Sequence, residues 1–354
     1  MFTADSNAVP VSIPEALPTE PAYSWKQIVG PVEPFLDAVS ACLAQQVDSF
    51  EPHLAAYADY ALNGQGKHLR PALVALTANA LGQAGDDHVT VAVIIEMVHL
   101  ATLVHDDVMD EAEIRRGQLT MASNWGNEIA VLFGDCLFAQ ALKLAASFPT
   151  PEVCRAVASA TNTVCAGEIL QTQHRRDFEF TQENYFKVLE MKTAELFALS
   201  CELSACLSGE SKEVRSVLRR FGLAFGTAYQ LYDDCVDLFG SEAAAGKSLG
   251  TDLAKGKLTL PVLLVRQRAQ PADQARLREF VKDWQNGALK GMGELLAKYE
   301  ALNASREIIA QYLDQARQIV RQLPASKGRT GLLGLTQYLA RQTGALGGGP
   351  ESGL

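Results

Sequence analysis

The sequence predicts a single all-α domain, because prolines are absent from long stretches and apolar residues recur at helical spacing. Six of the fourteen prolines fall within the first 34 residues, and none occurs in 72–148 or 152–260. Proline removes a helix hydrogen bond and clashes with the preceding turn, so proline-free stretches suit helices. Neither sustained apolar–polar alternation nor an Asn-Gly hairpin between apolar runs indicates a sheet. We therefore expect a bundle of antiparallel helices around a central apolar cavity.

In chain order, the first element is a tail. Residues 1–24 are rich in Pro, Ala and Ser and predict disorder, whereas 25–345 is the predicted helical domain. Within that domain, 89–113 carries apolar residues on nearly every face, as a central helix of a bundle does. In 305–323, apolar residues recur three or four positions apart, which predicts a helix with one buried face. Residues 346–354, which include Gly-Gly-Gly-Pro, are predicted to be a flexible C-terminal tail.

Composition and charge argue against several classes of protein. The chain has 354 residues, of which 48% are hydrophobic and 20% charged, and this composition is typical of a folded globular protein. Its longest uncharged run, 71–85, is shorter than the about 20 apolar residues of a membrane span, so no transmembrane segment is predicted. No Lys or Arg precedes Lys26, so no signal peptide is expected. The net charge of −10 argues against a nucleic-acid partner.

The cysteines indicate a reducing compartment. A disulfide framework or a zinc site would show pairs or tight clusters, and none of these cysteines is spaced Cys-x-x-Cys. The seven are Cys42, Cys136, Cys154, Cys165, Cys201, Cys206 and Cys235. We interpret them as reduced, mostly buried thiols and expect a cytoplasmic protein.

Two aspartate clusters, each reading D-D-x-x-D, carry the main chemical signal. They consist of Asp106, Asp107 and Asp110, and of Asp233, Asp234 and Asp237. At about 100° per residue, the three positions fall within roughly a 100° arc of one helix face. Such carboxylates repel one another unless a hard cation neutralises them, and oxygen-only ligands favour Mg²⁺ over zinc. Because Mg²⁺ keeps few protein ligands and favours phosphate oxygens, the clusters predict a polyphosphate substrate held through metal.

A solvated acidic helix end is the alternative interpretation of each cluster. One D-D-x-x-D by itself does not decide between the two. Both clusters, however, follow strongly apolar helix faces, at 100–104 and 223–232, where a solvated stripe is not expected. Two copies in that setting favour the metal site.

Basic residues next to these acids predict a second anion site. The stretch 64–71 reads GQGKHLRP and places Lys67 and Arg70 just before a helix that Pro71 can open. A Gly-rich helix N-terminus with two cations is suited to bind an anion.

Further cations flank both clusters. Arg115 and Arg116 directly follow the first cluster, and Lys247 and Lys257 lie in a Gly-containing loop after the second, which can close over a ligand. His99 lies about 20° from the first aspartate on the same helix face, although a histidine there is also typical of a core. The residues thus predict a helical cavity that holds diphosphate at two places, through Mg²⁺ and directly. Its apolar walls indicate a hydrocarbon substrate.

At these motifs the sequence resembles the trans-isoprenyl diphosphate synthases, also called polyprenyl synthetases. The resemblance runs from residue 34 to 341, and the full ordered set of motifs is specific although each piece is weak. The motifs are GKHLRP at 66–71, HLATLVHDDVMD at 99–110, RRG at 115–117, WGN at 125–127, FGD at 133–135, GEILQ at 167–171, KTAELF at 192–197, YQLYDDCVD at 229–237 and GKSLGTDLAKGKLTLP at 246–261. The resemblance implies the isoprenoid synthase fold.

The family implies condensation of isopentenyl diphosphate onto an allylic diphosphate, with Mg²⁺ (three ions when substrate is bound) and usually in a homodimer. The six aspartates would serve the metals that hold the allylic diphosphate, and the residues that would contact that diphosphate are Arg115, Lys192 and Lys247. Those that would hold isopentenyl diphosphate are Lys67, Arg70, His99 and Arg116. Beside the allylic carbon would lie Thr193 and Gln230, and Lys257 would help to close the second site.

The resemblance also bears on product length. In the family, the residues four and five before the first aspartate help to form the floor of the chain pocket, and here they are Thr102 and Ala101, neither of them aromatic. We therefore expect an all-trans product of about twenty carbons or more, such as a quinone side chain. The chain departs from the family at Gln65 and His68, where the family usually has Gly and Arg.

Three other functions compete with this interpretation. A class I terpene cyclase shares the helical fold and the first D-D-x-x-D, but it normally lacks the second copy and the isopentenyl diphosphate site. An HD-type metal phosphohydrolase is suggested by His99 and by the pair His105-Asp106, and it leaves the second cluster without a role. A non-catalytic subunit of a heteromeric synthase is expected to have lost one cluster, and both are intact. We therefore predict a prenyltransferase.

Overall fold

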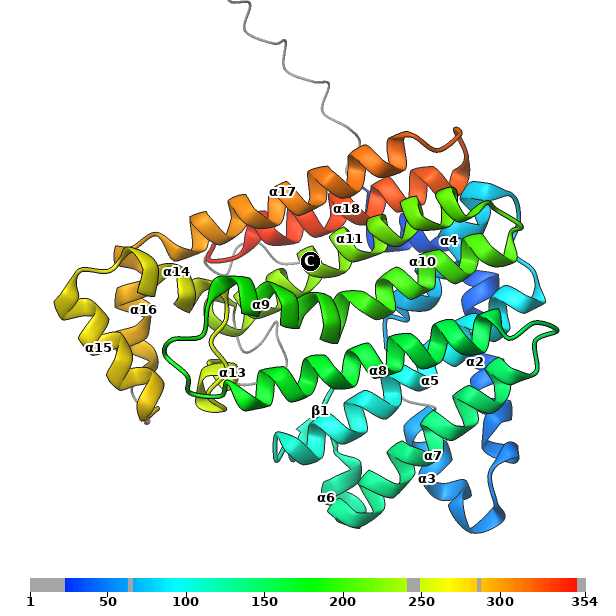
Figure 1. Ribbon diagram of the computed structural model, residues 1–354, viewed down its shortest axis with the longest axis horizontal. Helices are drawn as coiled ribbons and strands as arrows, with labels where there is room; N and C mark the ends of the chain where they lie inside the picture. The colour runs from blue at the N-terminus through cyan, green and yellow to red at the C-terminus, as the bar shows by residue number, and fades with distance from the viewer. Residues whose placement is uncertain (1–22, 63–65, 241–248, 285–287, 349–354) are drawn as a thin grey trace, which may run out of the picture.

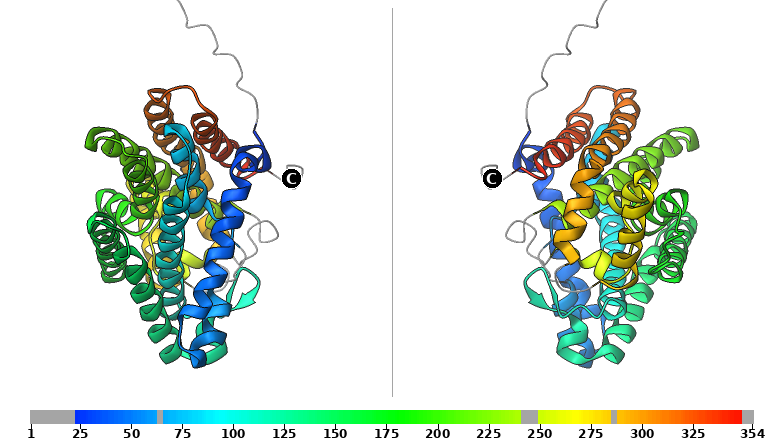
Figure 2. Two further views of the ribbon diagram at one scale, coloured as in Figure 1. Left: turned by 90° about the vertical axis from the view of Figure 1, so that its right-hand side faces the viewer. Right: turned by 90° about the vertical axis from the view of Figure 1, so that its left-hand side faces the viewer.

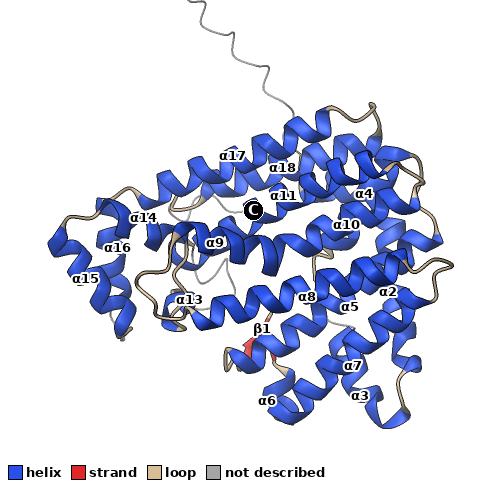
Figure 3. Cartoon of the chain, in the orientation of Figure 1, coloured by secondary structure: helices blue, strands red, loops and turns tan. Residues whose placement is uncertain are grey.

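Helices connected by short turns make up nearly all of the described chain (Figures 1 and 3). The computed structural model describes residues 23–62, 66–240, 249–284 and 288–348. The N-terminal half contains α1 (Trp25–Val29), α2 (Glu33–Gln46), α3 (Ala55–Leu62), α4 (Leu69–Leu81), α5 (Asp86–Met109), α6 (Met121–Trp125), α7 (Asn127–Ala146) and α8 (Glu152–Gln173). The all-α prediction is confirmed, and most of the two predicted tails lies outside the described residues.

The C-terminal half continues the bundle. It contains α9 (Gln182–Leu189), a π-helical turn η4 (Glu190–Ala194), α10 (Glu195–Leu207), α11 (Lys212–Phe239), α13 (Thr251–Ala254), α14 (Leu260–Arg268), α15 (Pro271–Lys282), α16 (Ala288–Lys298), α17 (Ala301–Arg321) and α18 (Lys327–Ala345). Three short 3₁₀ turns, η1 (Gly30–Val32), η2 (Val47–Ser49) and η3 (Pro52–Leu54), flank α2. The pair α15 and α16 extends beyond one end of the bundle in Figure 1.

The long helices pack side by side around two apolar cores. One core lies among α11, α14, α17 and α18 and includes Phe221 and Phe225, and the other lies among α2, α5 and α7 and includes Ile94 and Phe133. The two ends of the described chain meet, because α1 packs against α18 through the Trp25 and Tyr338 rings (Figure 2).

Helix α5 is the central helix that the sequence predicts. Its first turn carries Asp86 and Asp87, which suit the positive end of a helix dipole. Residues from Val91 to Val98 are buried without interruption, so α5 has no solvent face along this stretch. The helix ends at Met109 and not at residue 113, and Asp110 is its C-cap. The first aspartate cluster therefore lies at the very end of a buried helix.

The π-helical turn interrupts a helix that otherwise continues from α9 into α10. Glycines allow neighbouring helices to approach it: a Cβ on Gly167 of α8 would lie 2.8 Å from the Cβ of Met191, and one on Gly226 of α11 would lie 2.8 Å from the Cα of Ala194. Such turns add one residue to a helical turn and are frequent at functional sites. Here the turn carries Lys192 and Thr193.

A two-stranded hairpin is the one departure from an all-helical chain among the described residues. Strands β1 (Ile114–Arg115) and β2 (Gln118–Leu119) pair antiparallel, and they follow the first aspartate cluster. Arg116 and Gly117 both have positive φ, at 52° and 77°, which produces the tight turn between the strands. Two-residue strands leave no alternation that a sequence pattern could reveal.

Two helices, α5 and α7, are long and apolar enough to cross a membrane by length and composition. The apolar window of α5 is 61% buried inside the fold, and that of α7 is 39% buried. A core helix meets the same criterion, so this is weak evidence for a membrane span, and the expectation of no transmembrane segment stays a prediction. All seven cysteines are free thiols, but only Cys201 and Cys235 are buried, so the expectation that most are buried is wrong.

Candidate active site

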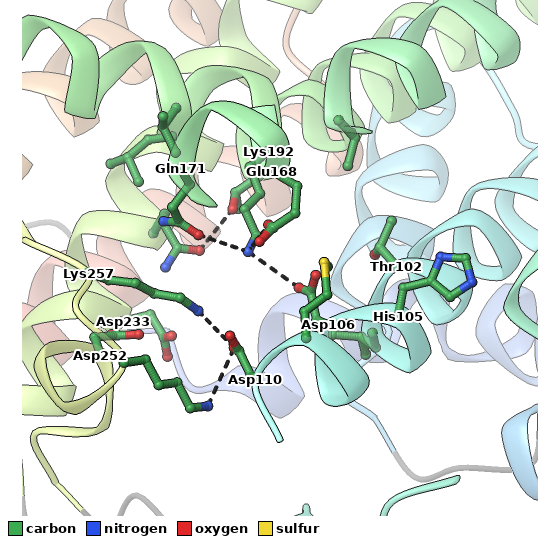
Figure 4. A pocket seen from close by; sticks show the side chains of 18 of the residues that line it. Thr102, His105, Asp106, Asp110, Glu168, Gln171, Lys192, Asp233, Asp252 and Lys257 are labelled. Carbon is green, nitrogen blue, oxygen red and sulfur yellow. Dashed lines mark hydrogen bonds and ion pairs between the residues drawn. The ribbon is translucent and has the colours of Figure 1, made fainter. Parts of the chain in front are cut away.

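A cavity of about 1070 Å³ opens between α5, α8, the π-helical turn, α11 and the loop that contains α13. Its volume exceeds the roughly 300–1,000 Å³ of ordinary small-molecule pockets. Charged groups gather at one end, where side chains from these elements point toward one another (Figure 4). Apolar side chains line other parts of the wall, among them Leu103, Phe138, Val164, Val188 and Leu196.

Each aspartate of the first cluster has a cationic partner. Asp106 lies 3.4 Å from Nζ of Lys192. Asp107 is 5% exposed, pairs with Nε of Arg115 at 2.8 Å and is not among the residues that line the cavity. The cluster therefore presents its first and third carboxylates to the cavity, and its second carboxylate holds the hairpin that follows.

Asp110 is the most heavily paired of the three. It lies 2.7 Å from Lys257 (Figure 4), 2.8 Å from Arg175 and 3.4 Å from Lys255. Burial acts to raise the pKa of Asp110, but Lys257 and Lys255 outweigh it and hold this pKa below its usual value. At Asp106 burial prevails over Lys192, and the pKa is raised. The carboxylates thus depend on neighbouring cations to stay ionised.

Asp234 of the second cluster has neutral hydrogen-bond partners. Asp233 and Asp234 line the cavity. Asp234 is 4% exposed and accepts hydrogen bonds from the Tyr185 hydroxyl and from Nε2 of Gln230 at 2.8 Å. Burial, reinforced by the nearby charge of Asp252, raises the pKa of Asp234 well above its usual value.

Asp237 is turned away from the cavity. It is 1% exposed and is not among the lining residues. Its Oδ1 accepts hydrogen bonds from Thr251 Oγ1 at 2.7 Å and from Thr251 N at 3.2 Å, and its Oδ2 accepts one from Asp252 N at 3.1 Å. The carboxylate that α13 contributes to the cavity is instead Asp252 (Figure 4).

The π-helical turn places two polar side chains in the cavity. Lys192 forms an ion pair with Glu168 and donates a hydrogen bond to Gln171 at 3.1 Å, both on α8. Burial lowers the pKa of Lys192, but its acidic neighbours more than compensate and raise it. Thr193 Oγ1 donates to Oε1 of Gln230 on α11 at 3.0 Å, so these two side chains lie together in the cavity wall.

A second group of cations lies where α4 begins. Arg70, His99 and Arg116 line the same cavity, and Arg70 packs its guanidinium over the Phe197 ring at 4.7 Å. Burial, with Arg70 and Arg116 nearby, lowers the pKa of His99 well below its usual value. The absence of a Cβ on Gly66 leaves room for the Arg116 guanidinium, since an added Cβ would lie 2.8 Å from it.

The remaining predicted residues are placed less directly. Lys67 is exposed and does not line the cavity, and Lys247 lies outside the described residues. His68, with φ 43°, lies 3.5 Å from the buried Glu96 on α5. His68 occupies the position where the family usually has Arg, and it faces the Glu96 carboxylate.

The two residues expected to limit product length, Ala101 and Thr102, differ in whether they line the cavity. Thr102 lines the cavity, and its hydroxyl donates to the His99 carbonyl at 2.6 Å. Ala101 is fully buried in the core behind it and is not a lining residue. The cavity wall also includes His105 and Phe138, whose ring centroids lie 5.7 Å apart.

Several cavity residues were given no role from the sequence. They are Glu168, Gln171, Tyr185, Tyr229, Asp252 and Lys255. Arg175, which pairs with Asp110 but is not a lining residue, was also given no role. Glu168 and Gln171 belong to the GEILQ motif that matched the family, so a signal for them existed. Arg175 and Tyr185 lie in no such motif, and only the packing of α8 and α9 brings them to the aspartates.

The donor set fits Mg²⁺ that is shared with a substrate. Within the described ranges, no three His, Cys, Asp or Glu side chains converge closely enough to hold an ion by themselves. Carboxylate oxygens of Asp106, Asp110, Asp233 and Asp252 nevertheless face one cavity (Figure 4). Mg²⁺ commonly uses one or two carboxylates together with substrate phosphates rather than an all-protein cage.

Fold and site define a class: an all-helical enzyme whose cavity combines carboxylates and cations for metal-bound diphosphates above apolar walls. The sequence profile of the polyprenyl synthetase family matches residues 51–295. The chain belongs to the polyprenyl synthetase family and is a trans-prenyltransferase that elongates prenyl chains. This membership favours a synthase over the terpene cyclase and the phosphohydrolase.

Relatives and solved structures agree with this assignment. The chain is 34% identical over 306 residues to octaprenyl diphosphate synthase of Escherichia coli K12, covering 86% of this chain and 94% of that protein. It is 37% identical over 289 residues to nonaprenyl diphosphate synthase of Mycobacterium tuberculosis, covering 80% and 84%. Its fold is similar to a decaprenyl diphosphate synthase from Rhodobacter capsulatus, with a TM-score of 0.84, 31% identity and coverage of 90% and 99%. A polyprenyl synthase from Caulobacter crescentus, complexed with calcium and isoprenyl diphosphate, has a TM-score of 0.85, 31% identity and coverage of 91% and 98%.

Proposed function

We propose that this protein condenses isopentenyl diphosphate head-to-tail onto an allylic diphosphate and makes an all-trans polyprenyl diphosphate of about twenty carbons or more. The observation that carries the proposal is that one cavity holds two separate polar regions. One is the aspartate-lined end with Lys192, and the other is the cation group around Arg70 and His99. A condensation needs one diphosphate at each region, with the two hydrocarbon ends close together.

The allylic diphosphate belongs at the aspartates. The residues that would hold Mg²⁺ are Asp106, Asp110, Asp233 and Asp252, and three ions are expected with substrate bound. When bound, Mg²⁺ supplies positive charge that stabilises the pyrophosphate leaving group. Lys192, Lys255 and Lys257 already lie at these carboxylates and can turn to phosphate oxygens, because each ammonium group has three donors.

Isopentenyl diphosphate belongs at the second region. Arg70 and Arg116 offer planar guanidinium donors, which suit phosphate oxygens. His99 is neutral near neutral pH, because its pKa is lowered, and it can donate one N–H to the same anion. Lys67, although exposed, lies on the loop beside these residues and is proposed to complete the contact.

The reaction centre lies between the two regions. As the allylic C–O bond breaks, its electron pair leaves with pyrophosphate and a delocalised carbocation remains. The Thr193 hydroxyl and the Gln230 amide present dipoles there without forming a covalent bond. The isopentenyl double bond then attacks the cation, and a proton passes from the new chain to the departed pyrophosphate.

We further propose that the growing chain passes Thr102 and runs along the wall that includes Phe138. Replacing Thr102 by Phe should place a ring across this path and shorten the product. The matched control is Thr102→Val, which keeps the size of the side chain. Unchanged product length in Thr102→Phe would contradict this path.

Assembly and location are part of the proposal. Helix α7 leaves Val131 and Leu132 exposed, at 41% and 61%, and Ile169 of α8 is 59% exposed. Such a surface is suited to a second copy of the chain, and we propose a homodimer. Leu132→Glu should convert the dimer to a monomer in analytical ultracentrifugation. The seven free thiols support a cytoplasmic location.

One experiment tests the activity directly. Purified protein is incubated with Mg²⁺, isopentenyl diphosphate and each of the C10, C15 and C20 allylic primers, and the products are separated by chain length. Elongation with at least one primer is expected. Release of phosphate without elongation would indicate the phosphohydrolase, and cyclic hydrocarbon from the primer alone would indicate the terpene cyclase.

A further inference from the structure

The third aspartate of the second cluster occupies a different environment from every other aspartate of the two clusters. Asp237 lies inside α11, which continues to Phe239, whereas Asp110 lies just beyond the end of α5. Because α11 continues past it, residues 250–252 can fold back over the Asp237 side chain. The 1% exposure of Asp237 is the result of this cover.

Among the described residues, the hydrogen-bond donors to the Asp237 carboxylate belong to that covering segment. Its two carboxylate oxygens accept three hydrogen bonds, from the Thr251 hydroxyl, the Thr251 amide and the Asp252 amide, at 2.7, 3.2 and 3.1 Å. Its backbone carbonyl accepts a fourth, from Gly250 N at 2.7 Å. An ionised carboxylate offers about four acceptor sites, so most of its capacity is used.

The segment that Asp237 holds leads directly to the first cluster. Lys255 and Lys257 lie a few residues further along it, and both ammonium groups contact Asp110. A second attachment fixes the segment in between, where Arg176 N donates to the Gly256 carbonyl at 2.7 Å. Asp237 and Asp110, which occupy the same position in the two motifs, are thus connected through one loop.

We propose that Asp237 is a positioning residue that anchors residues 250–252, so that Asp252, Lys255 and Lys257 face the diphosphate, and that it is not a metal ligand. This inference rests on the proposed function of the same cavity. Mg²⁺ requires near-octahedral coordination and keeps several water ligands, and the covered Asp237 carboxylate leaves no room for them. The cavity carboxylates of this half are Asp233, Asp234 and Asp252.

Hydrogen exchange tests the anchor without substrate or metal, so its outcome does not depend on prenyl transfer. In Asp237→Asn one acceptor oxygen is lost while the shape is kept, and the amides of 250–252 should exchange at least about fivefold faster. Thr251→Val removes the partner hydroxyl and should act in the same direction. Thr251→Ser keeps the hydroxyl and should exchange like the wild type. Wild-type exchange in both Asp237→Asn and Thr251→Val would overturn the proposal.

Calorimetry with Mg²⁺ and inorganic pyrophosphate separates the anchor from a metal ligand. If Asp237 positions the loop, Asp237→Asn and Thr251→Val weaken pyrophosphate binding by similar factors, about fivefold, and the double variant is no weaker than the single ones. If Asp237 binds metal, Asp237→Asn resembles Asp233→Asn, while Thr251→Val resembles the wild type. That second pattern would overturn the proposal.

Steady-state kinetics gives a readout that a purely structural role would not produce. Both anchor variants should raise KM for the allylic diphosphate about fivefold and leave KM for isopentenyl diphosphate within twofold, because the loop faces one substrate only. A loss of folded protein would lower the apparent kcat and leave both KM values unchanged. Equal increases in the two KM values would contradict an anchor for this loop.

Discussion

The two aspartate clusters have the same D-D-x-x-D pattern and are held in opposite ways. In the first, every carboxylate meets a cation: Asp106 meets Lys192, Asp107 meets Arg115, and Asp110 meets a lysine pair and an arginine. In the second, Asp234 and Asp237 meet hydroxyl, amide and backbone N–H donors. The motif sets the carboxylate positions along the chain, and the surroundings set their charge.

The difference follows from where each helix ends. Helix α5 stops within the first cluster, so its last carboxylate meets side chains from the turn that follows α8 and from the loop after α13. Helix α11 runs through the second cluster, and its carboxylates face neighbouring helices and one covering loop. A helix end is open to charged side chains from several directions, whereas a helix interior is packed.

The two kinds of surroundings have different consequences for the charge of a carboxylate. A carboxylate whose cations outweigh its burial, as at Asp110, stays ionised and can exchange a cation for a metal ion at little electrostatic cost. One held by neutral donors in a buried site has its pKa raised, as burial does at Asp234. Four predictions test this contrast, in order of decreasing effect.

The largest effect is expected on catalysis. Asp106→Asn and Asp233→Asn each remove a carboxylate that lines the cavity, and each should lower kcat by about 10²–10³ at saturating Mg²⁺. Asp135→Asn removes the same charge at a residue that does not line the cavity and serves as the control. If Asp233→Asn stays within tenfold of the wild type, the first cluster alone serves the leaving group.

The next effect is on stability. Asp110→Asn leaves Lys257, whose side chain is 9% exposed, without its anionic partner, and should lower the free energy of unfolding by about 2–3 kcal/mol. Asp234→Asn disturbs two neutral partners, the Tyr185 hydroxyl and the Gln230 amide, and should lower it by less than about 1 kcal/mol. Urea unfolding of both variants in EDTA measures the difference. Equal losses of unfolding free energy in the two variants would contradict the contrast between Asp110 and Asp234.

The pH dependence of stability should have opposite signs at Asp110 and at Asp234. Lysines lower the pKa of Asp110, so its stabilisation is present above about pH 4 and is lost as the pH falls toward the folded-state pKa. Burial raises the pKa of Asp234, so ionisation is disfavoured in the folded state and stability falls as the pH rises from about 4.

Each unit of pKa shift corresponds to about 1.4 kcal/mol. The loss of stability in Asp110→Asn should therefore grow between pH 3 and pH 6. Over the same range Asp234→Asn should become more stable relative to the wild type, because only the wild type has a buried carboxyl whose ionisation is disfavoured in the folded state. Unfolding in metal-free buffers across this range checks both slopes, and parallel slopes would contradict the contrast.

The smallest effect concerns a single neutral hydrogen bond. Tyr185→Phe removes the hydroxyl that donates to Asp234 and should lower the free energy of unfolding by about 1 kcal/mol. In an Asp234→Asn background the same change should cost less, because the acceptor is no longer a buried carboxyl. A double-mutant cycle by thermal unfolding measures the coupling, and strict additivity would show that the two groups do not interact.

Much of the fold and the site could be predicted from the sequence because the signals are local. The proline-free stretches and the apolar periodicity correctly predicted helices, since backbone hydrogen bonding and amphipathic burial depend on near neighbours. The resemblance named Thr193, Gln230, Arg70, His99 and Arg116 as site residues one by one, and the structure places all five in the wall of one cavity.

Other features depended on distant parts of the chain. The π-helical turn that carries Lys192 requires the close approach of α8 and α11 at two glycines, which no local pattern encodes. Arg175 reaches Asp110 only because α8 ends beside α5. The short hairpin after the first cluster contains too few residues to leave an alternating pattern.

The sequence by itself determined that this is an all-helical chain with two carboxylate clusters and a set of cations, and so the class of chemistry. Only the tertiary structure decided which carboxylates face the cavity. Asp107 and Asp237 have the correct helical phase yet turn to Arg115 and Thr251, and Asp252 takes a place in the wall. Helical spacing fixes an angle around one axis, whereas the neighbours that each side chain meets depend on how separate helices and loops pack.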